Sequence, residues 1–385
     1  MYKTVSVVFL FILTVSCGKS EDKWLPSRSV VFDIGFVNQG KFSGILYDSE
    51  SKENLFYFAD PISDRIIKFY DNRGNLNDSV SLVAAVAEIQ VVDGISVISK
   101  DSIVLLNKRA NQLQVLDRGG NTWYRLDLNQ FSFDTGAIYH FSSSISGNFV
   151  LEGNSLLLHP IWYGNPQDIK ENKVPREGYE SAKYYYTHFV HSPHLIKIED
   201  VFSPSPKAIY GLDDFYWNME NKVAAYIDGC FSTYKKGKVF VFSCFSPNLF
   251  CVNPINLQII EEIRIVEDAQ AVALPAPLAQ TIDSDVLNFE LQHKSIVGDF
   301  GYSSKNKKYI LIQTIDISKN KEKDYRPFKV SVLDEKFKIE KVVVFDEGKY
   351  LWYSSFIADD GVYILKKVED EKSNFGIKKY DFFEL

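Results

Sequence analysis

Short apolar runs alternate with polar turns along most of the chain. In each repeat, an apolar run is followed by a polar turn and then by a strand that ends in Asp or Asn, as in residues 55–60 and 65–74. Further copies lie at residues 103–107 with 112–120, 239–243 with 249–253, 309–312 with 329–334, and 362–365 with 376–381, and a weaker one ends at 195–199. Two such runs joined by a polar turn are typical of a β-hairpin. The pattern therefore predicts a repeated hairpin.

The spacing of the copies predicts a β-propeller. Their last strands end at Asp71, Asp117, Glu199, Asn253, Asp334 and Asp381, at intervals of 46, 82, 54, 81 and 47 residues. A propeller blade of four strands takes about 40 to 50 residues, so each long interval is one blade plus roughly 35 residues. We expect six blades with two blade insertions, and seven blades is the alternative.

The two ends of the chain predict how the ring closes. Residues 379–383 form the third strand of a blade in this register, and the sequence stops directly after them. A strand at residues 29–34 can supply the fourth, which removes the exposed edge that an open sheet would leave. Residues 29–385 are therefore expected to form a single all-β propeller domain.

Composition is consistent with this fold and narrows the partners. Aromatic residues make up 15% of the chain, a proportion that favours strands. The formal net charge of −7 argues against nucleic acid or anionic lipid as a partner.

The N-terminus carries the features of an exported lipoprotein. Lys3 precedes a short apolar stretch at residues 5–15, which has the length of a signal-peptide core rather than of a membrane span. Ser16 and Cys17 then form a cleavage and acylation site that resembles a lipobox, although Leu13 lies four residues before the cysteine instead of three. We expect residues 1–16 to be a signal peptide, Cys17 to carry lipid, and residues 17–28 to be a tether. The predicted location is the outer membrane, facing the periplasm or the cell surface, and ordinary secretion is the alternative.

The lipobox, the six irregular blades and the Tyr-Asp or Leu-Asp strand ends together resemble uncharacterised Bacteroidota lipoproteins with TolB-like or NHL-like six-bladed propellers. This resemblance implies the fold, but propellers host many unrelated functions. Six-bladed lactonase-like enzymes hold calcium in the central channel through acidic and amide residues. Acidic pairs at residues 213–214, 267–268, 283–285 and 359–360 could contribute to such a site, or could lie in solvated turns.

Other candidate chemistry is weak. His188, His191 and His194 could bind zinc or copper, but their spacing favours a loop or strand edge without metal. Cys244 and Cys251 would face each other if the hairpin turned at residues 247–248, which permits a disulfide, while buried free thiols are the alternative. No nucleophile elbow or phosphate-binding loop is present in the sequence. We therefore expect no catalytic residue and no cofactor.

Aromatic residues mark the most promising binding segment. The insertion running from about residue 153 to 194 contains Trp162, Tyr163, Tyr184, Tyr185 and Tyr186. Exposed Trp and Tyr rings suit sugars and peptide side chains, although packing between blades also uses many aromatics. We expect this segment to cover one face of the ring and to contact a ligand. The sequence thus predicts a lipid-anchored propeller that binds a glycan, a peptide or a protein; the alternative is a metal-dependent, lactonase-like hydrolase with its site in the channel.

Overall fold

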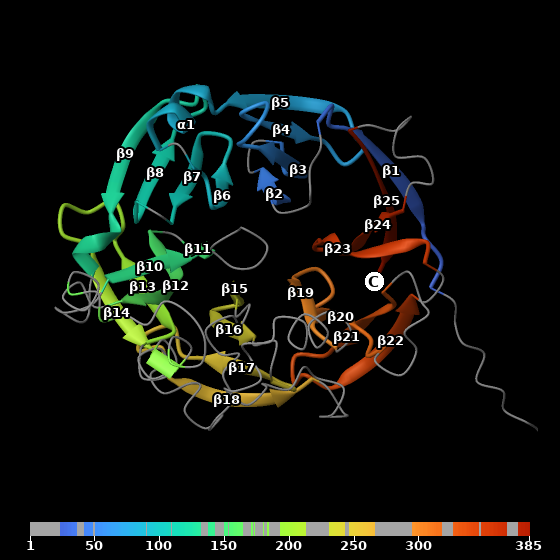
Figure 1. The fold of residues 1–385 in the computed structure, drawn as a ribbon. Helices are drawn as coiled ribbons and strands as arrows, with labels where there is room; N and C mark the ends of the chain where they lie inside the picture. Colours follow the sequence, from blue (N-terminus) through green and yellow to red (C-terminus); the bar gives the residue numbers. More distant parts are fainter. Residues whose placement is uncertain are drawn as a thin grey trace, which may run out of the picture.

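The computed structural model of this chain shows a ring of six β-sheets around a central axis (Figure 1). It describes residues 24–36, 42–48, 51–89, 91–108, 110–131, 138–142, 150–152, 154–164, 171, 173, 180, 183–184, 193–212, 231–242, 246–265, 295–317, 326–345, 348–367 and 376–385. All strand pairs within the sheets are antiparallel. The prediction of an all-β propeller with six blades is confirmed.

The first three blades are given from the innermost strand outward. Blade 1 consists of β2 (Ser43–Asp48), β3 (Glu53–Asp60), β4 (Ile66–Tyr70) and β5 (Leu76–Ser81). Blade 2 consists of β6 (Gly94–Ser99), β7 (Ser102–Asn107), β8 (Gln112–Leu116) and β9 (Thr122–Asp127). Blade 3 consists of β10 (Ile138–Ser142), β11 (Val150–Glu152), β12 (Ser155–Gly164), β13 (Leu195–Glu199) and β14 (Lys207–Gly211).

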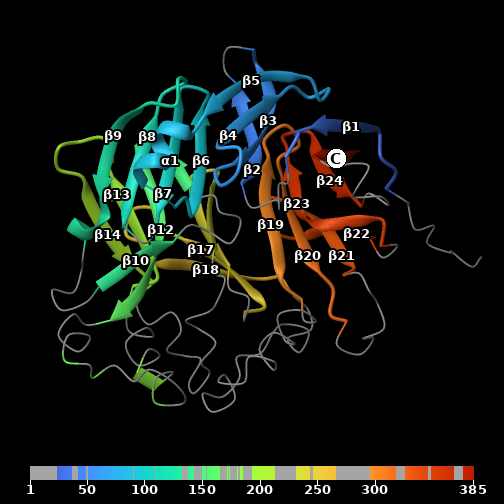
Figure 2. The ribbon, with the colours of Figure 1, turned by 45° about the horizontal axis from the view of Figure 1, so that its top comes forward.

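The remaining blades complete the ring. Blade 4 consists of β15 (Phe231–Lys235), β16 (Lys238–Phe242), β17 (Asn248–Val252) and β18 (Ile259–Arg264). Blade 5 consists of β19 (Val297–Ser303), β20 (Lys308–Thr314), β21 (Phe328–Leu333) and β22 (Ile339–Phe345). Blade 6 consists of β23 (Tyr350–Ile357), β24 (Gly361–Lys366), β25 (Ile377–Glu384) and β1 (Arg28–Asp33). Helix α1 (Val83–Ile89) and the 3₁₀ helix η1 (Leu128–Phe131) follow the outer strands of blades 1 and 2 (Figure 2).

The predicted hairpins are the second and third strands of the blades. These strands are buried on both faces because a neighbouring blade covers each side, so β20 and β24 read as nearly continuous apolar runs. Outer strands such as β22 are largely exposed. The hydrophobic core consequently lies between blades, as one cluster for each neighbouring pair.

The acidic strand ends close the outer hairpins. Asp71 follows β4, and its carboxylate accepts the backbone N–H groups of Arg73 and Asn75, both at 2.9 Å. In blade 2 the backbone N–H of Asn121 bonds Asp117 at 2.9 Å and helps to hold the pKa of that carboxyl below its ordinary value. Asn253 and Asp334 cap the same turn in blades 4 and 5. In blades 1, 2, 4 and 5 the repeated residue is thus a turn residue, whereas Asp381 lies within β25 of blade 6.

Ring closure occurs as predicted. Strand β1 pairs with β25 over six residues, from Arg28 opposite Phe382 to Asp33 opposite Ile377. Strand β1 therefore supplies the outermost strand of the last blade.

The first insertion begins later than the sequence indicated. Residues 155–164, which were expected to belong to it, form the ten-residue strand β12. Leu156–Leu158 pair with β13, and the farther half of β12 pairs with β10 instead. The additional chain of this blade therefore starts after Gly164, between β12 and β13. The second long interval falls between β18 and β19.

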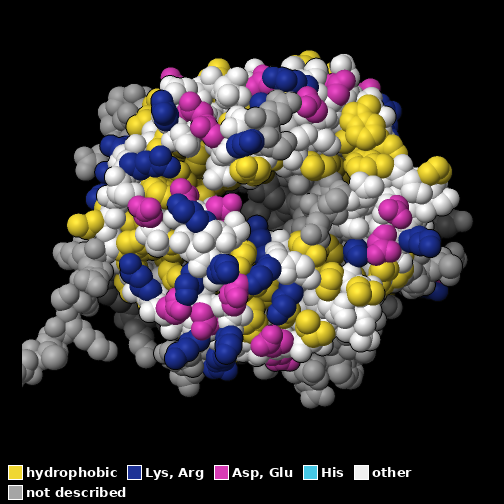
Figure 3. All heavy atoms as spheres, turned by 180° about the vertical axis from the view of Figure 1, so that it is seen from behind, with side chains coloured by type: hydrophobic (Ala, Val, Ile, Leu, Met, Phe, Trp, Pro, Cys, Tyr) yellow, Lys and Arg dark blue, Asp and Glu magenta, His cyan; other side chains and the backbone are white. Residues whose placement is uncertain are grey.

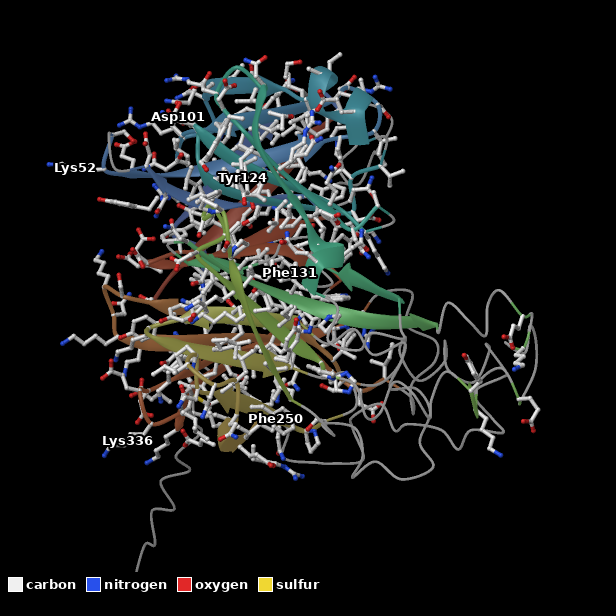
Figure 4. All side chains as sticks on the ribbon, turned by 90° about the vertical axis from the view of Figure 1, so that its left-hand side faces the viewer. Lys52, Asp101, Tyr124, Phe131, Phe250 and Lys336 are labelled. Atoms are coloured by element: carbon white, nitrogen blue, oxygen red, sulfur yellow. The ribbon has the colours of Figure 1, made fainter. Side chains whose placement is uncertain are left out.

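The two faces of the ring carry different turns. Turns between the first and second strands and between the third and fourth strands share one face, where Lys52, Asp101 and Lys336 lie (Figure 4). On the described part of this face, acidic and basic side chains are interspersed around a hollowed centre (Figure 3).

Candidate functional site

The innermost strand of blade 6, β23, is interrupted by a large bulge. Leu351 pairs with Leu365 and Phe356 pairs with Tyr363, so the segment Trp352–Ser355 lies opposite a single residue of β24. Ser354 has a φ of 59°. Among the non-glycine residues described with a positive φ, it alone lies inside a strand. Bulges and strained backbone concentrate next to functional sites, where they redirect side chains.

The bulge places Trp352 against β19, the innermost strand of blade 5. A Cβ atom at Gly298 would come within 2.8 Å of the Trp352 ring, so the indole can approach only because this residue is glycine. The guanidinium carbon of Arg326 lies 5.8 Å from the centre of the Trp352 ring. Tyr353 stands edge-on to the indole at 5.9 Å and is 45% exposed. Two aromatic rings and one cation therefore meet where Trp352 packs against the core between blades 5 and 6.

Asp299, which is next to Gly298 in the sequence, carries an unusual carboxyl group. It follows Gly298 at a register shift in β19 and lies opposite Ile312, whose side chain belongs to the core between blades 5 and 6. Directly opposed residues share one face of a sheet, so Asp299 is on the side of blade 6. Burial raises the pKa of Asp299 to about 6, although the charge of Lys235 and the backbone N–H of Phe300, at 2.7 Å, oppose this rise.

We define Asp299, Arg326, Trp352 and Tyr353 as the β19–β23 cluster. It offers an aromatic surface, a permanent cation, and a carboxyl group that changes charge near neutral pH. Small-ligand sites are typically lined by aromatic and other apolar side chains with a small number of polar groups. No group of three or more His, Cys, Asp or Glu side chains that could hold a metal occurs in the described part of the chain. One carboxylate does not supply the six to eight oxygen ligands that calcium takes.

No protein-family model matches this chain, and a search of curated proteins also finds no match. A member of the DUF4221 family from Bacteroides vulgatus superposes with a TM-score of 0.65 at 12% identity, covering 94% of this chain and 97% of that one. The two proteins share a fold. A protein of unknown function from Bacteroides caccae reaches a TM-score of 0.39 at 8% identity, over 82% and 84% of the two chains. A putative 6-phosphogluconolactonase from Bacteroides uniformis reaches 0.35 at 12% identity, over 86% and 81%. The last two are too distant to support an argument.

The aromatic residues predicted from the sequence do not form one described site. Trp162 lies in β12 opposite Tyr139, and Tyr163 lies beside it at a register shift, so both belong to a blade strand. Tyr184 is half-buried and packs against the hydrophobic cluster between blades 2 and 3. Tyr185 and Tyr186 lie outside the described residues, as does Cys17, and a contact of any of these with a ligand or lipid stays a prediction.

Of the three candidate histidines, only His194 is described. It is buried, and its carbonyl oxygen accepts a bond from Nδ1 of His159 at 3.0 Å. Burial lowers the pKa of His159 to about 4, despite that bond, so this imidazole is neutral at pH 7. His188 and His191 lie outside the described residues. The backbone N–H of His194 donates to the carbonyl oxygen of Gly211 at 3.1 Å, directly before β13, and metal binding by the three histidines stays a prediction.

The predicted hairpin register, which would place Cys244 opposite Cys251, is wrong. Phe240 lies opposite Cys251, and Val239 lies opposite Val252, whereas a turn at residues 247–248 would place Cys244 opposite Cys251. Cys251 is a buried free thiol in the core between blades 4 and 5. Cys244 lies outside the described residues.

Of the acidic pairs, the structure describes only residues 359–360. These form the turn after β23: the hydroxyl of Ser303 donates to the carbonyl oxygen of Asp359, and Leu385 N–H donates to that of Asp360 at 3.1 Å. This pair therefore joins blades 5 and 6 through its backbone. Within the described ranges, no helix has the length and apolar character needed to cross a membrane.

Sequence reasoning missed the β19–β23 cluster. Asp299, Arg326 and the adjacent pair Trp352 and Tyr353 are separated by 27 and 26 residues and come from three different connections or strands. One signal was available: Ser354 and Ser355 are two adjacent polar residues inside an otherwise apolar and aromatic run at residues 350–357.

Proposed function

We propose that this protein is a cell-envelope lipoprotein whose propeller binds a small polar ligand at the β19–β23 cluster. The observation that carries the proposal is the bulge in β23, which holds Trp352 against Gly298 beside a carboxyl group with a raised pKa. A protein does not keep strained backbone in an inner strand without compensation, and a ligand contact would provide a reason for it.

The chemistry favours a sugar or a peptide side chain among the ligands. An aromatic ring such as that of Trp352 packs on the apolar face of a sugar, while the polar N–H edge of the indole remains hydrated. Asp299 accepts hydrogen bonds from hydroxyl groups when ionised, and Arg326 donates them. Since Asp299 and Arg326 have opposite charges, the cluster suits a ligand that is polar and carries little net charge.

A glycan and peptide screen of the purified protein tests this proposal. Trp352→Ala should weaken the binding of any hit at least about 10-fold, the loss expected when a stacked aromatic contact is removed. Trp123→Ala is the matched control, because Trp123 is an exposed indole on an outer strand of blade 2. Equal binding by wild type and Trp352→Ala would place the site elsewhere.

The membrane anchor is the second part of the proposal. Trp24 is fixed to the ring, since its Nε1–H donates to the carbonyl oxygen of Glu384 at 2.8 Å and its ring lies 5.4 Å from Phe383. An extended chain spans at most about 3.6 Å per residue, so lipid on Cys17 would hold Trp24 within about 25 Å of the membrane. Cys17→Ala should move the protein from the membrane fraction to the soluble fraction.

A metal-dependent hydrolase remains the alternative function. It requires several carboxylate, amide or imidazole groups that converge in the channel, and Asp299 is the single such carboxylate that the β19–β23 cluster provides. Metal analysis of undialysed protein separates the two functions: stoichiometric zinc or calcium would favour the hydrolase.

A further inference from the structure

A cavity of about 180 Å³ lies between blades 3 and 4, away from the β19–β23 cluster. Its walls come from β12 and β13 of blade 3, from β15 and β16 of blade 4, and from the turn that follows β17. Blades 3 and 4 are neighbours in the ring (Figure 1). This turn belongs to the same face of the ring as Lys52 and Lys336 (Figure 4).

A largely buried cation forms one wall. The side chain of Lys197 is only 16% exposed. Its ammonium group donates to the Glu199 carboxylate at 2.7 Å and to the carbonyl oxygen of Pro254 at 3.0 Å. An ammonium group has three protons, and these two bonds use two of them. Lys197 can therefore donate one further hydrogen bond to an acceptor in the cavity.

The other walls are mostly apolar. Leu157 and Val239 are buried members of the core between blades 3 and 4. Tyr234 packs against the same core, and Ile255 is 75% exposed, which places it at the rim. An apolar cavity of about 150 Å³ is known to hold a benzene ring. The volume between blades 3 and 4 thus accommodates one ring with a small substituent.

We propose that this cavity binds a small aromatic carboxylate. The ring would lie between Leu157 and Val239, and the carboxylate would accept the third proton of Lys197 in a charge-assisted hydrogen bond. A neutral ring of the same shape would gain the apolar contacts without that bond. Glu199 partly neutralises Lys197, so it limits the affinity for the anion rather than contributing to it.

Titration of the full-length protein with benzoate, followed by ligand-observed NMR, tests this assignment. Lys197→Met keeps the aliphatic stem of the side chain and removes the charge. It should weaken benzoate binding at least about 10-fold, as loss of a hydrogen bond to a charged group does. Binding of benzyl alcohol, which has a similar shape and no charge, should change little in the same variant.

Two further variants control the experiment. Glu199→Gln retains a hydrogen-bond acceptor for Lys197 without its negative charge, so it should tighten benzoate binding. Lys238→Met removes a lysine of blade 4 whose ammonium lies over the Phe337 ring. It should leave benzoate binding unchanged.

The proposal is overturned if wild type shows no saturable benzoate binding, or if Lys197→Met binds benzoate as wild type does while its melting temperature is unchanged. Trp352→Ala should leave benzoate binding intact. This outcome would show that benzoate does not bind at the β19–β23 cluster. The proposal for the cavity and the proposal for the cluster can therefore be refuted independently.

Discussion

The hydroxyl group of Ser29 donates a hydrogen bond to the carboxylate of Asp381, which lies directly opposite it in the β1–β25 ladder. The same carboxylate accepts a bond from the Tyr350 hydroxyl at 2.7 Å and lies 3.8 Å from the Lys366 ammonium. Asp381 is 2% exposed. One buried side chain therefore joins the N-terminal strand to three strands of the last blade.

We predict that Asp381→Ala strongly destabilises the ring. It removes the acceptor of the Ser29 and Tyr350 hydroxyl groups and the charge near Lys366, which should lower the free energy of unfolding by about 2 to 4 kcal/mol. Urea unfolding measures the change. Asp78→Ala is the control, because the Asp78–Arg118 pair is on the surface and such a pair contributes at most about 1 kcal/mol. A loss for Asp381→Ala as small as that of the control would mean that the polar contacts do not stabilise closure.

We predict that Gly298→Ala impairs ligand binding without unfolding the protein. The added Cβ would displace the Trp352 ring, which lies too close to accept it. Affinity for a ligand found in the screen should fall, while the free energy of unfolding should decrease by about 1 to 3 kcal/mol, as overpacking usually causes. Gly119→Ala is the control, since its Cβ would meet only the flexible side chains of Asn121 and Asp117. Unchanged affinity in Gly298→Ala would remove Trp352 from the site.

Asp299 should make the protein less stable above pH 6. Its pKa is raised from 3.8 to about 6 in the folded state, so the folded protein binds this proton more tightly than the unfolded chain does. Stability from this group is present at low pH and is lost as pH rises from about 4 through 6. Asp299→Asn should therefore melt at a higher temperature than wild type at pH 8, by an amount equivalent to at most about 3 kcal/mol. The two proteins should melt alike near pH 4, and a constant difference across this range would refute the raised pKa.

His159 should have the opposite effect. Its pKa is lowered from 6.5 to about 4, so the unfolded chain takes up a proton in this range before the folded protein does. Stability is therefore lost as pH falls from about 6.5 to 4. His159→Asn keeps an N–H donor for the His194 carbonyl and removes the titration. The melting temperature of this variant should decline less than that of wild type between pH 7 and 4.5, and parallel curves would contradict the prediction.

The sequence predicted the blades because each hairpin repeats the same physical constraints. Strands that are covered on both sides must be apolar, and the turn after them needs an acceptor such as Asp71 for its backbone N–H groups. Closure was also predictable, since a third strand at the end of the chain needs a partner. These features depend on neighbours that are close in sequence or fixed by the repeat.

The candidate site depends on contacts that the repeat does not specify. Trp352 reaches Gly298 only because β23 bulges, and Asp299 acquires its raised pKa from its burial. Trp162 was assigned to an insertion because the repeat provides no ten-residue strand, whereas β12 continues past β13 to pair with β10. The predicted hairpin register also differs from the structure, where Phe240 rather than Cys244 lies opposite Cys251.

Fluorine NMR of the full-length protein labelled with 5-fluorotryptophan tests the central claim most directly. The chain has 5 tryptophans, and single Trp→Phe variants assign the resonances of Trp162 and Trp352. Addition of a ligand from the screen should shift the Trp352 resonance and leave that of Trp123 unchanged. A shift at Trp162 with none at Trp352 would contradict the account and return the site to the aromatic segment of blade 3.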